Sequence, residues 1–549
     1  DGDCEFDAVT VESGTTLDLN GQRAEFGDTL TYESTSTLNA SGLAVFHSGF
    51  TKYGTLTNAA SGDIIALNDT GLATFSYIGG YRTFFQNGGV QLGTGGFTNV
   101  GKAIVAGTTN VGTRDTSSTD LSIPVGGVFQ AEAKTHTVSG NFNMAGGLIG
   151  KSALLASGTH WASGASVLDY SGIDVTAISI GGWAKGIDVA NGDTNQMVQR
   201  QDDNFIGIQA DGSIYVGVEL QNSASGYDYP AVITADGTIS DNKWHHVGMT
   251  WGSGSTLKVY LDGKLVGENT SISSDYVRLK QRAAGRPMGV GAYQGIYGYE
   301  GIVGQACRWH TELSESDIRT HMFQDFSSLA STTNLIYWYQ FDSMTGTVIL
   351  DSSSNNVDLT SVTIASNAAE AAWVGPGTFT YGTSTLKFDK AGTCNLYGEQ
   401  DGSATDLYSL TVTNGTTLET YCNANDFIIN SGATLVNSGT LNSNRNWQYK
   451  SPNMPIVGAS SDLTVGNNIF YYFAPAVSGA GTTYHSFQPG NGVDLYMQGD
   501  FSAYSIYPYS DSIVHFNGYK GTAGYAGLNS YSSGNVVLEP CSSINFPNA

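Results

Sequence analysis

The chain has 549 residues, of which 71 are Gly, 40% are hydrophobic and only 13% are charged. This composition is poor in the Glu, Lys and Arg that favour helices, and its hydrophobic content excludes a disordered chain. The formal net charge of −25 opposes nucleic-acid binding, and the apolar runs fall short of the roughly 18 residues that a membrane helix needs. We therefore expect a soluble all-β protein with no nucleic-acid partner and no membrane insertion.

A repeated unit near both ends of the chain is the strongest internal signal. Residues 9–19 (VTVESGTTLDL) align with residues 410–420 (LTVTNGTTLET), and looser copies follow at 53–58, 427–435 and 437–441. Each unit is a short alternating strand, an Asn-Gly or Ser-Gly turn and a second short strand, which cannot bury its apolar face alone. Stacked coils of a β-solenoid would cover these faces, whereas a series of hairpins in a β-sandwich is the alternative.

The tryptophans mark a middle segment that is built differently. Six of the eight fall between residues 161 and 338, whereas the flanks are rich in Ser, Thr, Asn and Gly. We place a β-solenoid-like region at 1–151, an inserted domain at 152–376, a resumed β-solenoid-like region at 377–449 and a Tyr-rich β region at 450–549. The tyrosines of the last region could form a subunit interface, where Tyr is enriched.

Within the insert the expected elements follow one another closely. Residues of alternating faces predict a strand at 244–251. A hairpin is expected at 257–266, where Asp262-Gly263 suits a two-residue turn. Ser314 followed by Asp317 predicts the capped start of a helix.

The order of these motifs resembles the laminin G-like, concanavalin A-like jelly-roll family. Members show a W-H-H-V strand, here 244–247, followed by a V-Y-L-D-G hairpin, here 259–263. The family's short helix is announced by L-S-x-x-E-I, and residues 313–318 (LSESDI) carry Asp in place of Glu. The resemblance also implies family strands at 178–185, 299–309 and 334–342 and a hairpin at 205–216. It implies a jelly-roll β-sandwich, a fold that serves glycan lectins, protein-binding modules, glycosidases and plain spacers.

Sugar binding needs aromatic ring faces beside amide or carboxylate groups on exposed loops. Two segments have this pattern, although buried strand tyrosines would explain it too. The candidate ligand-binding residues are Tyr227, Asp228, Tyr229, Tyr293, Gln294, Tyr297 and Tyr299.

Calcium is the ion that the family resemblance implies, although no cofactor is required. Loop carboxylates and carbonyls suit this hard cation, which takes six to eight oxygen ligands. Capping of ordinary Asx turns explains the same residues. The candidate ligands are Asp202 and Asp203 with Asn204, or Asp351, Asn355 and Asp358.

Catalysis is not expected. His245 and His246 are adjacent on a strand and point to opposite faces, so they cannot bind one ion together. The sequence has no H-E-x-x-H or G-x-S-x-G motif and no strand of alternating acids like that of the glucanases, although two acids from distant loops could still converge. Cys394 and Cys422 could form a disulfide or pack as small apolar groups.

The whole pattern resembles structural proteins of tailed phages, particularly marine ones. It implies a fibre, spike or decoration protein at the virion surface or outside the cell, with the jelly roll binding a glycan or receptor. A secreted cell-surface adhesin or filament subunit is the alternative, and a glycan-degrading tailspike is the third reading. Because the terminal coils of a solenoid need covering, we expect a homo-oligomer, with a trimer as the default, beside other virion or surface proteins.

Overall fold

A computed structural model gives the fold and describes residues 3–545 with gaps. The gaps of five or more residues are 58–62, 67–76, 92–99, 165–173, 187–195, 281–287, 293–297, 364–372, 399–404, 422–426, 430–434, 450–455 and 529–534.

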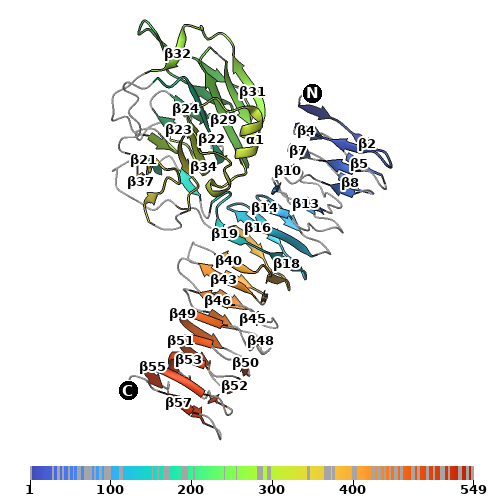
Figure 1. Cartoon of the computed structure of the whole chain (residues 1–549), viewed down its shortest axis with the longest axis vertical. Coiled ribbons are helices and arrows are strands. Elements are labelled where there is room, and N and C mark those ends of the chain that lie inside the picture. Colours follow the sequence, from blue (N-terminus) through green and yellow to red (C-terminus); the bar gives the residue numbers. More distant parts are fainter. Residues whose placement is uncertain are drawn as a thin grey trace. The chain divides into compact units, whose positions relative to one another are not determined.

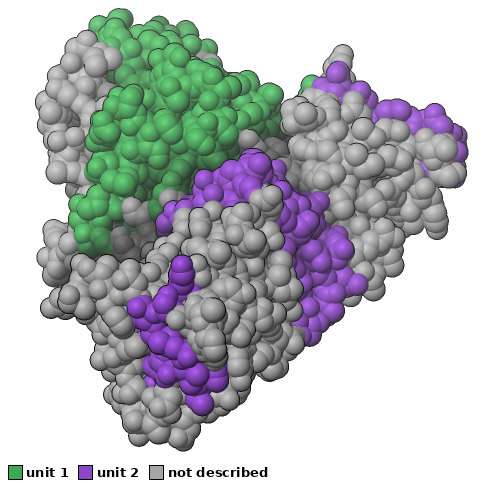
Figure 2. Space-filling model, turned by 60° about the horizontal axis from the view of Figure 1, so that its bottom comes forward, with its two compact units in different colours: residues 1, 21–23, 146–374 green, residues 2–20, 24–145, 375–549 purple. Residues whose placement is uncertain are grey.

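The chain divides into two compact units, coloured green and purple in Figure 2. Unit 1 comprises residues 146–374 with residue 1 and 21–23, and unit 2 comprises 2–20, 24–145 and 375–549. The predicted insert spans residues 152–376, whereas the long segment of unit 1 runs from 146 to 374.

Unit 1 is built from two large antiparallel sheets (Figure 1). The seven-stranded sheet contains β20 (Leu154–Ala156), β34 (Gly301–Trp309), β22 (Ala177–Lys185), β29 (Trp244–Gly252), β30 (Leu257–Leu261) and β31 (Lys264–Asn269), with β35 (Leu335–Tyr339) paired to β34. The eight-stranded sheet runs β28 (Ala231–Ile233), β25 (Ile214–Gly217), β24 (Asn204–Ile208), β23 (Gln196–Gln201), β33 (Met288–Val290), β21 (His160–Gly164), β37 (Leu359–Thr363) and β36 (Val348–Ile349). A small third sheet holds β27 (Tyr227–Asp228), β26 (Leu220–Asn222) and β32 (Tyr276–Leu279).

The core of unit 1 is formed by apolar side chains of both large sheets. It includes Ile178 and Met249 of the seven-stranded sheet and Ile206, Ile214 and Val216 of the eight-stranded sheet, all nearly fully buried. Both sheets therefore contribute to one apolar core, and the all-β, jelly-roll fold class predicted for the insert is confirmed.

Local sequence signals in unit 1 form the predicted elements. Asp262 and Gly263 both have positive φ, 49° and 73°, and join β30 to β31 as a two-residue hairpin turn. Helix α1 (Glu315–His321) begins at Ser314, whose side chain accepts from the Asp317 N–H at 3.1 Å. The Asp317 carboxylate in turn accepts from the Ser314 N–H at 3.0 Å, so the predicted capping box is present. A 3₁₀ turn, η1 (Phe326–Ser328), follows.

Unit 2 consists of short strands that pair in parallel with strands of the next coil. Three ladders lie in its first part. One contains β2 (Val9–Val11), β5 (Leu30–Tyr32) and β8 (Phe50–Lys52), and another contains β3 (Thr16–Asp18), β6 (Thr37–Asn39), β9 (Thr55–Thr57) and β11 (Tyr77–Ile78). The longest contains β1 (Cys4–Phe6), β4 (Arg23–Phe26), β7 (Leu43–Phe46), β10 (Asp63–Ala66), β12 (Arg82–Phe85), β14 (Val100–Val105), β16 (Thr116–Pro124) and β18 (Thr135–Val138). A fourth holds β13 (Val90–Gln91), β15 (Thr108–Asn110), β17 (Val128–Gln130) and β38 (Thr378–Thr380). Successive short strands of unit 2 therefore pair in parallel along the chain, and the β-solenoid stays a prediction.

The parallel stack continues across the point where unit 1 is inserted. β18 pairs with β39 (Thr385–Phe388), and β19 (Asn141–Gly146) pairs with β40 (Gly392–Tyr397). The stacked rings of Phe129 and Phe379, 5.9 Å apart, lie on the two sides of the same junction. The chain therefore leaves the stack, forms unit 1 and resumes with the next coil.

The stack extends to the end of the described chain, so the Tyr-rich region shares the parallel pairing of the coils before it. The later strands are β41 (Thr405–Leu407), β42 (Ser409–Val412), β43 (Thr416–Tyr421), β44 (Phe427–Ile429), β45 (Leu435–Asn437), β46 (Thr440–Ser443), β47 (Trp447–Tyr449), β48 (Ile456–Val457), β49 (Asp462–Tyr471), β50 (Ala476–Ser478), β51 (Thr482–Pro489), β52 (Asp494–Gln498), β53 (Phe501–Ile506), β54 (Ile513–His515), β55 (Lys520–Leu528), β56 (Asn535–Val537) and β57 (Ser543–Asn545). Both β46 and β47 pair with β49, so the Tyr-rich region is joined to the coils before residue 450.

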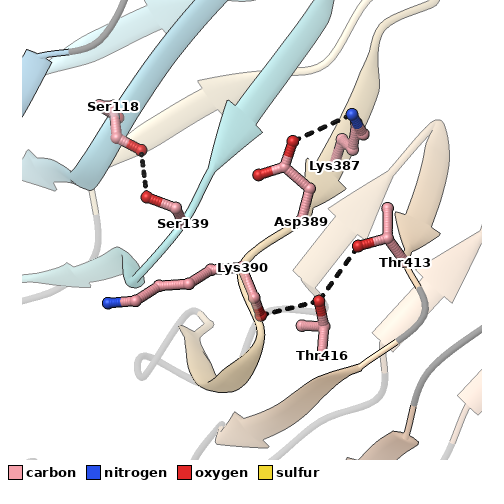
Figure 3. Close-up of polar contacts among 7 residues, drawn as sticks. All are labelled: Ser118, Ser139, Lys387, Asp389, Lys390, Thr413 and Thr416. Carbon is pink, nitrogen blue, oxygen red and sulfur yellow. Dashed lines mark hydrogen bonds and ion pairs between the residues drawn. The ribbon is translucent and has the colours of Figure 1, made fainter.

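Polar contacts at the turns link neighbouring coils (Figure 3). The Thr416 hydroxyl donates to the Lys390 carbonyl at 2.9 Å, and the Ser139 hydroxyl donates to the Ser118 carbonyl at 3.5 Å. Cys394 is a buried free thiol opposite Leu418 of the next coil. Packing as a small apolar group is therefore what the structure shows for Cys394, while Cys422 lies outside the described residues.

Candidate functional site

Two exposed tyrosines stand at the edge of the small three-stranded sheet of unit 1. Tyr227 opens β27 and is 48% exposed, and Tyr229 follows that strand and is 56% exposed. Contiguous exposed apolar surface is a frequent mark of a binding site. These two of the predicted ligand-binding residues are therefore brought together on the surface.

A lysine lies against both rings. The Lys280 ammonium is 4.1 Å from the centre of the Tyr227 ring and 5.9 Å from that of Tyr229, within the range of cation–π attraction. The same ammonium forms an ion pair with the Glu219 carboxylate, whose side chain is 2% exposed. Tyr227, Tyr229, Lys280 and Glu219 are called the tyrosine cluster below.

Glu219 also holds the second tyrosine in place. A hydrogen bond between the Tyr229 hydroxyl and the Glu219 carboxylate is the main cause that raises the pKa of Tyr229 above its ordinary value. The phenol is therefore protonated at neutral pH and donates to the carboxylate. One buried acid thus orients both the ammonium and an exposed ring.

The preceding turn sets the direction of the tyrosines. The Asn222 side-chain oxygen accepts from the N–H groups of Ala224 at 3.0 Å and Gly226 at 2.7 Å, which closes the turn between β26 and β27. Asp228, also a predicted ligand residue, accepts from the Tyr229 N–H at 2.9 Å. In this arrangement the Asp228 carboxylate shapes the backbone between the two rings.

The second predicted sugar-binding segment does not join the cluster. Tyr293, Gln294 and Tyr297 lie outside the described residues. Tyr299 is completely buried, and its hydroxyl donates to the Gly186 carbonyl at 2.9 Å. Burial raises the pKa of Tyr299 far above its ordinary value. This ring belongs to the core and offers no face to a ligand.

Two of the predicted calcium ligands, Asp351 and Asp358, are engaged in a turn. One Asp351 oxygen accepts from the Trp338 N–H and the Ser353 N–H, each at 2.9 Å, and the other accepts from the Val357 N–H at 3.0 Å. Asp358 accepts from the Asp351 N–H at 2.8 Å. These contacts are those of a capped turn, the alternative weighed for the sequence.

The remaining calcium candidates do not contribute ligand oxygens beside Asp351 and Asp358 among the residues that the structure describes. Asn355 directs its amide group, a donor, to the carbonyls of Leu335 and Ile336. Asp202 and Asp203 lie outside the described residues. No group of three or more His, Cys, Asp or Glu side chains that could hold a metal occurs in the described part of the chain. Calcium binding stays a prediction.

The two adjacent histidines have separate surroundings. His245 Nδ1 lies 2.8 Å from Asp262 Oδ2 and is partly exposed. His246 is buried between β22 and α1, where desolvation lowers its pKa to about 4. A cavity of about 20 Å³ beside it, also lined by Gln305, Cys307 and His321, has room for roughly one water molecule. The site is structural in character and offers no space for a substrate.

Residues 157–319 match the family model Laminin_G_3, described as the concanavalin A-like lectin/glucanases superfamily. Unit 1 contains a concanavalin A-like domain. This match confirms the resemblance predicted for the insert, and it includes every member of the tyrosine cluster.

Comparison with solved structures finds similarities of low sequence identity over part of this chain. A putative carbohydrate binding protein from Bacteroides ovatus is 14% identical with a TM-score of 0.29, over 40% of this chain and 61% of its own. A heptameric SAP-like pentraxin from Limulus polyphemus is 15% identical with a TM-score of 0.20, over 29% and 74%. The receptor binding domain of a botulinum neurotoxin C/D mosaic serotype is 15% identical with a TM-score of 0.20, over 29% and 41%. No curated protein matches the chain.

Sequence reasoning missed Lys280 and Glu219. A signal for Glu219 exists, because it is the one acid in the apolar segment 214–220 (IYVGVEL) and an acid is rarely buried without a partner. Its partner Lys280 lies 61 residues later in the sequence, so only the fold reveals the pair.

Proposed function

We propose that the concanavalin A-like domain binds glycans through the tyrosine cluster. The exposed tyrosine pair carries this proposal, because exposed aromatic rings offer flat apolar faces to the C–H-rich faces of sugar rings. The family match, which includes lectins by its own description, supports the same class of ligand.

The chemistry of the cluster fits a ligand that is both apolar and hydroxylated. Lys280 and Glu219 are polar groups at the edge of the rings, and they can exchange hydrogen bonds with hydroxyl groups. Glu219 fixes Tyr229 and Lys280 before a ligand arrives, which reduces the entropy lost on binding. The geometry assigns binding to the site and assigns no bond cleavage.

A panel of immobilised glycans probed with the full chain tests this function. Tyr227→Ala and Tyr229→Ala should each weaken binding at least tenfold, which corresponds to about 1.4 kcal/mol. Tyr381→Ala, which removes a partly exposed tyrosine of unit 2, is the matched control and should leave binding unchanged. Binding to no glycan, or equal loss in the control, contradicts the proposal.

We further propose that the repetitive coils of unit 2 form the structural body of a virion fibre, spike or decoration protein that displays the lectin-like domain. Parallel coils that continue across the insertion support this role, because they build a long framework without using the insert. Antibody labelling in electron micrographs tests it. Label on virions supports the proposal, whereas label only on cell surfaces favours the secreted adhesin or filament subunit.

Self-association belongs to the same proposal, with a trimer as the default. Mass photometry of the purified chain should then give a peak at three times 57.8 kDa. No helix in the described residues is long and apolar enough to cross a bilayer. Incubation of the chain with the glycans that it binds, followed by analysis of the products, tests the glycan-degrading alternative.

A further inference from the structure

A strip of side chains leads away from the tyrosine cluster along β28. From Tyr229 to Thr234 exposure alternates strictly: Tyr229 and Ile233 are 56% and 59% exposed, while Val232 and Thr234 are 8% and 7% exposed. Tyr229, Ala231 and Ile233 therefore lie on the face of the eight-stranded sheet that points away from the core. Ile233 is the most exposed large apolar side chain among the described residues of the chain.

The neighbouring strand continues the same face. Tyr215 pairs with Ile233 and Gly217 with Ala231, and the same register brings Glu219 opposite Tyr229. The alternate residues of β25, Ile214 and Val216, belong to the core. The outward face thus has the tyrosine cluster at one end and Ile233 with Tyr215 at the other.

A glycine in the middle of the strip allows an aromatic ring to support it. A Cβ on Gly217 would lie 2.7 Å from the Phe205 ring, so that ring occupies the space over the glycine. The Phe205 ring also packs edge-on against the Tyr215 ring, with 4.7 Å between the ring centres. The Arg200 guanidinium lies over the Phe205 ring, 5.4 Å from its centre. The edge-on contact with Phe205 therefore helps to fix the position of Tyr215 before a ligand binds.

The two ends of the strip are too far apart for one sugar ring. Tyr229 and Ile233 are four residues apart on an extended strand, which corresponds to about 13 Å. Resting on the proposed glycan-binding function, we propose that the site is bipartite, with a second contact at Ile233 and Tyr215, and that its ligand is a linear oligosaccharide lying along β28. A terminal monosaccharide would fill only the tyrosine cluster.

Affinity for oligosaccharides of increasing length tests this inference. The probes are linear β-1,3-, β-1,4- and α-1,4-linked gluco-oligosaccharides of one to six units, titrated into the full chain by calorimetry. For the linkage that binds, affinity should rise at least tenfold from one unit to four and then level off. Equal affinity at all lengths overturns the bipartite site and leaves the proposed function standing, whereas binding of none of these sugars and of no glycan on the panel overturns both.

Matched variants separate the two contacts. Ile233→Asn should remove the gain with length and keep the affinity for the shortest sugar, whereas Tyr229→Ala should weaken binding at every length. Leu350→Asn is the control, because Leu350 is 55% exposed and follows β36 at the opposite edge of the eight-stranded sheet. If Ile233→Asn behaves like Leu350→Asn while Tyr229→Ala abolishes binding, the second contact does not exist.

Discussion

The ammonium of Lys280 pairs with the carboxylate of Glu219, a side chain that is only 2% exposed. The ammonium also lies against the exposed rings of Tyr227 and Tyr229. Because the acid compensates the charge of the lysine, the pair presents hydrogen-bonding groups without a net charge. The tyrosine cluster should therefore favour uncharged glycans.

Substitution of Glu219 changes this selectivity in a defined direction. Glu219→Gln keeps the shape of the side chain and leaves the Lys280 charge uncompensated, so affinity for acidic oligogalacturonates should rise about tenfold relative to neutral sugars, or about 1.4 kcal/mol. Calorimetric titration of both probes measures the ratio. The double variant Glu219→Gln with Lys280→Met is the control and should return the ratio to its original value. An unchanged ratio in the single variant would show that the pair does not set selectivity.

The turn around Asp351 makes a prediction about stability and calcium. Asp351→Asn replaces an acceptor with an amide N–H that faces the Val357 or Ser353 N–H, so it should destabilise unit 1 by about 2 kcal/mol. Thermal unfolding with and without added calcium measures both effects, and calcium should not change the difference between variant and wild type. Asp236→Asn, in an exposed loop, is the control. A calcium-dependent difference would mean that Asp351 binds the ion.

Two buried histidines predict a loss of stability in acid. Burial lowers the pKa of His136 in unit 2 and of His246 in unit 1 to about 4, below the ordinary value of 6.5. Between these values the unfolded chain binds a proton that the folded chain does not, so stability falls as pH drops from 6.5 to 4. Each histidine contributes about 3 kcal/mol to this loss.

Calorimetric unfolding at pH 7.5, 5.5 and 4.5 measures the effect. His136→Gln and His246→Gln are a matched pair, because each should reduce the pH dependence of its own unit and leave that of the other unaltered. His136 is held by hydrogen bonds of 2.8 Å to Thr116 and to the Ala131 carbonyl, so its variant also lowers stability at pH 7.5. The same slope in wild type and both variants would rule out these residues as the cause.

The elements that could be predicted are those specified within a few residues. Asp262-Gly263 predicts its turn because both residues tolerate positive φ, and Ser314 with Asp317 predicts a helix start because they satisfy each other's backbone groups. Exposure at Tyr227 and Tyr229 also agrees with the sequence-based prediction, since the segment lies just after a polar turn.

Contacts between distant parts of the chain could not be predicted in this way. The ion pair of Glu219 and Lys280 and the parallel pairing of β18 with β39 depend on how strands assemble, and neither leaves a periodic pattern in a short window. Tyr299 illustrates the opposite failure. Its Y-G-Y surroundings suggest an exposed loop, yet the ring lies in the core and its hydroxyl donates to the Gly186 carbonyl, a contact with a distant part of the chain.

The capping box of α1 supports the last prediction. Ser314→Ala removes the acceptor for the Asp317 N–H and should lower the stability of unit 1 by about 1 kcal/mol. Ser316→Ala, two residues on at an exposed position of the same helix, is the matched control and should be neutral or slightly stabilising, because Ala favours helix interiors. Thermal unfolding measures both variants. Because Arg319 of α1 donates to the Gly263 carbonyl at the hairpin turn, loosening the helix should also speed hydrogen exchange at β30 and β31, and unchanged exchange there would contradict this coupling.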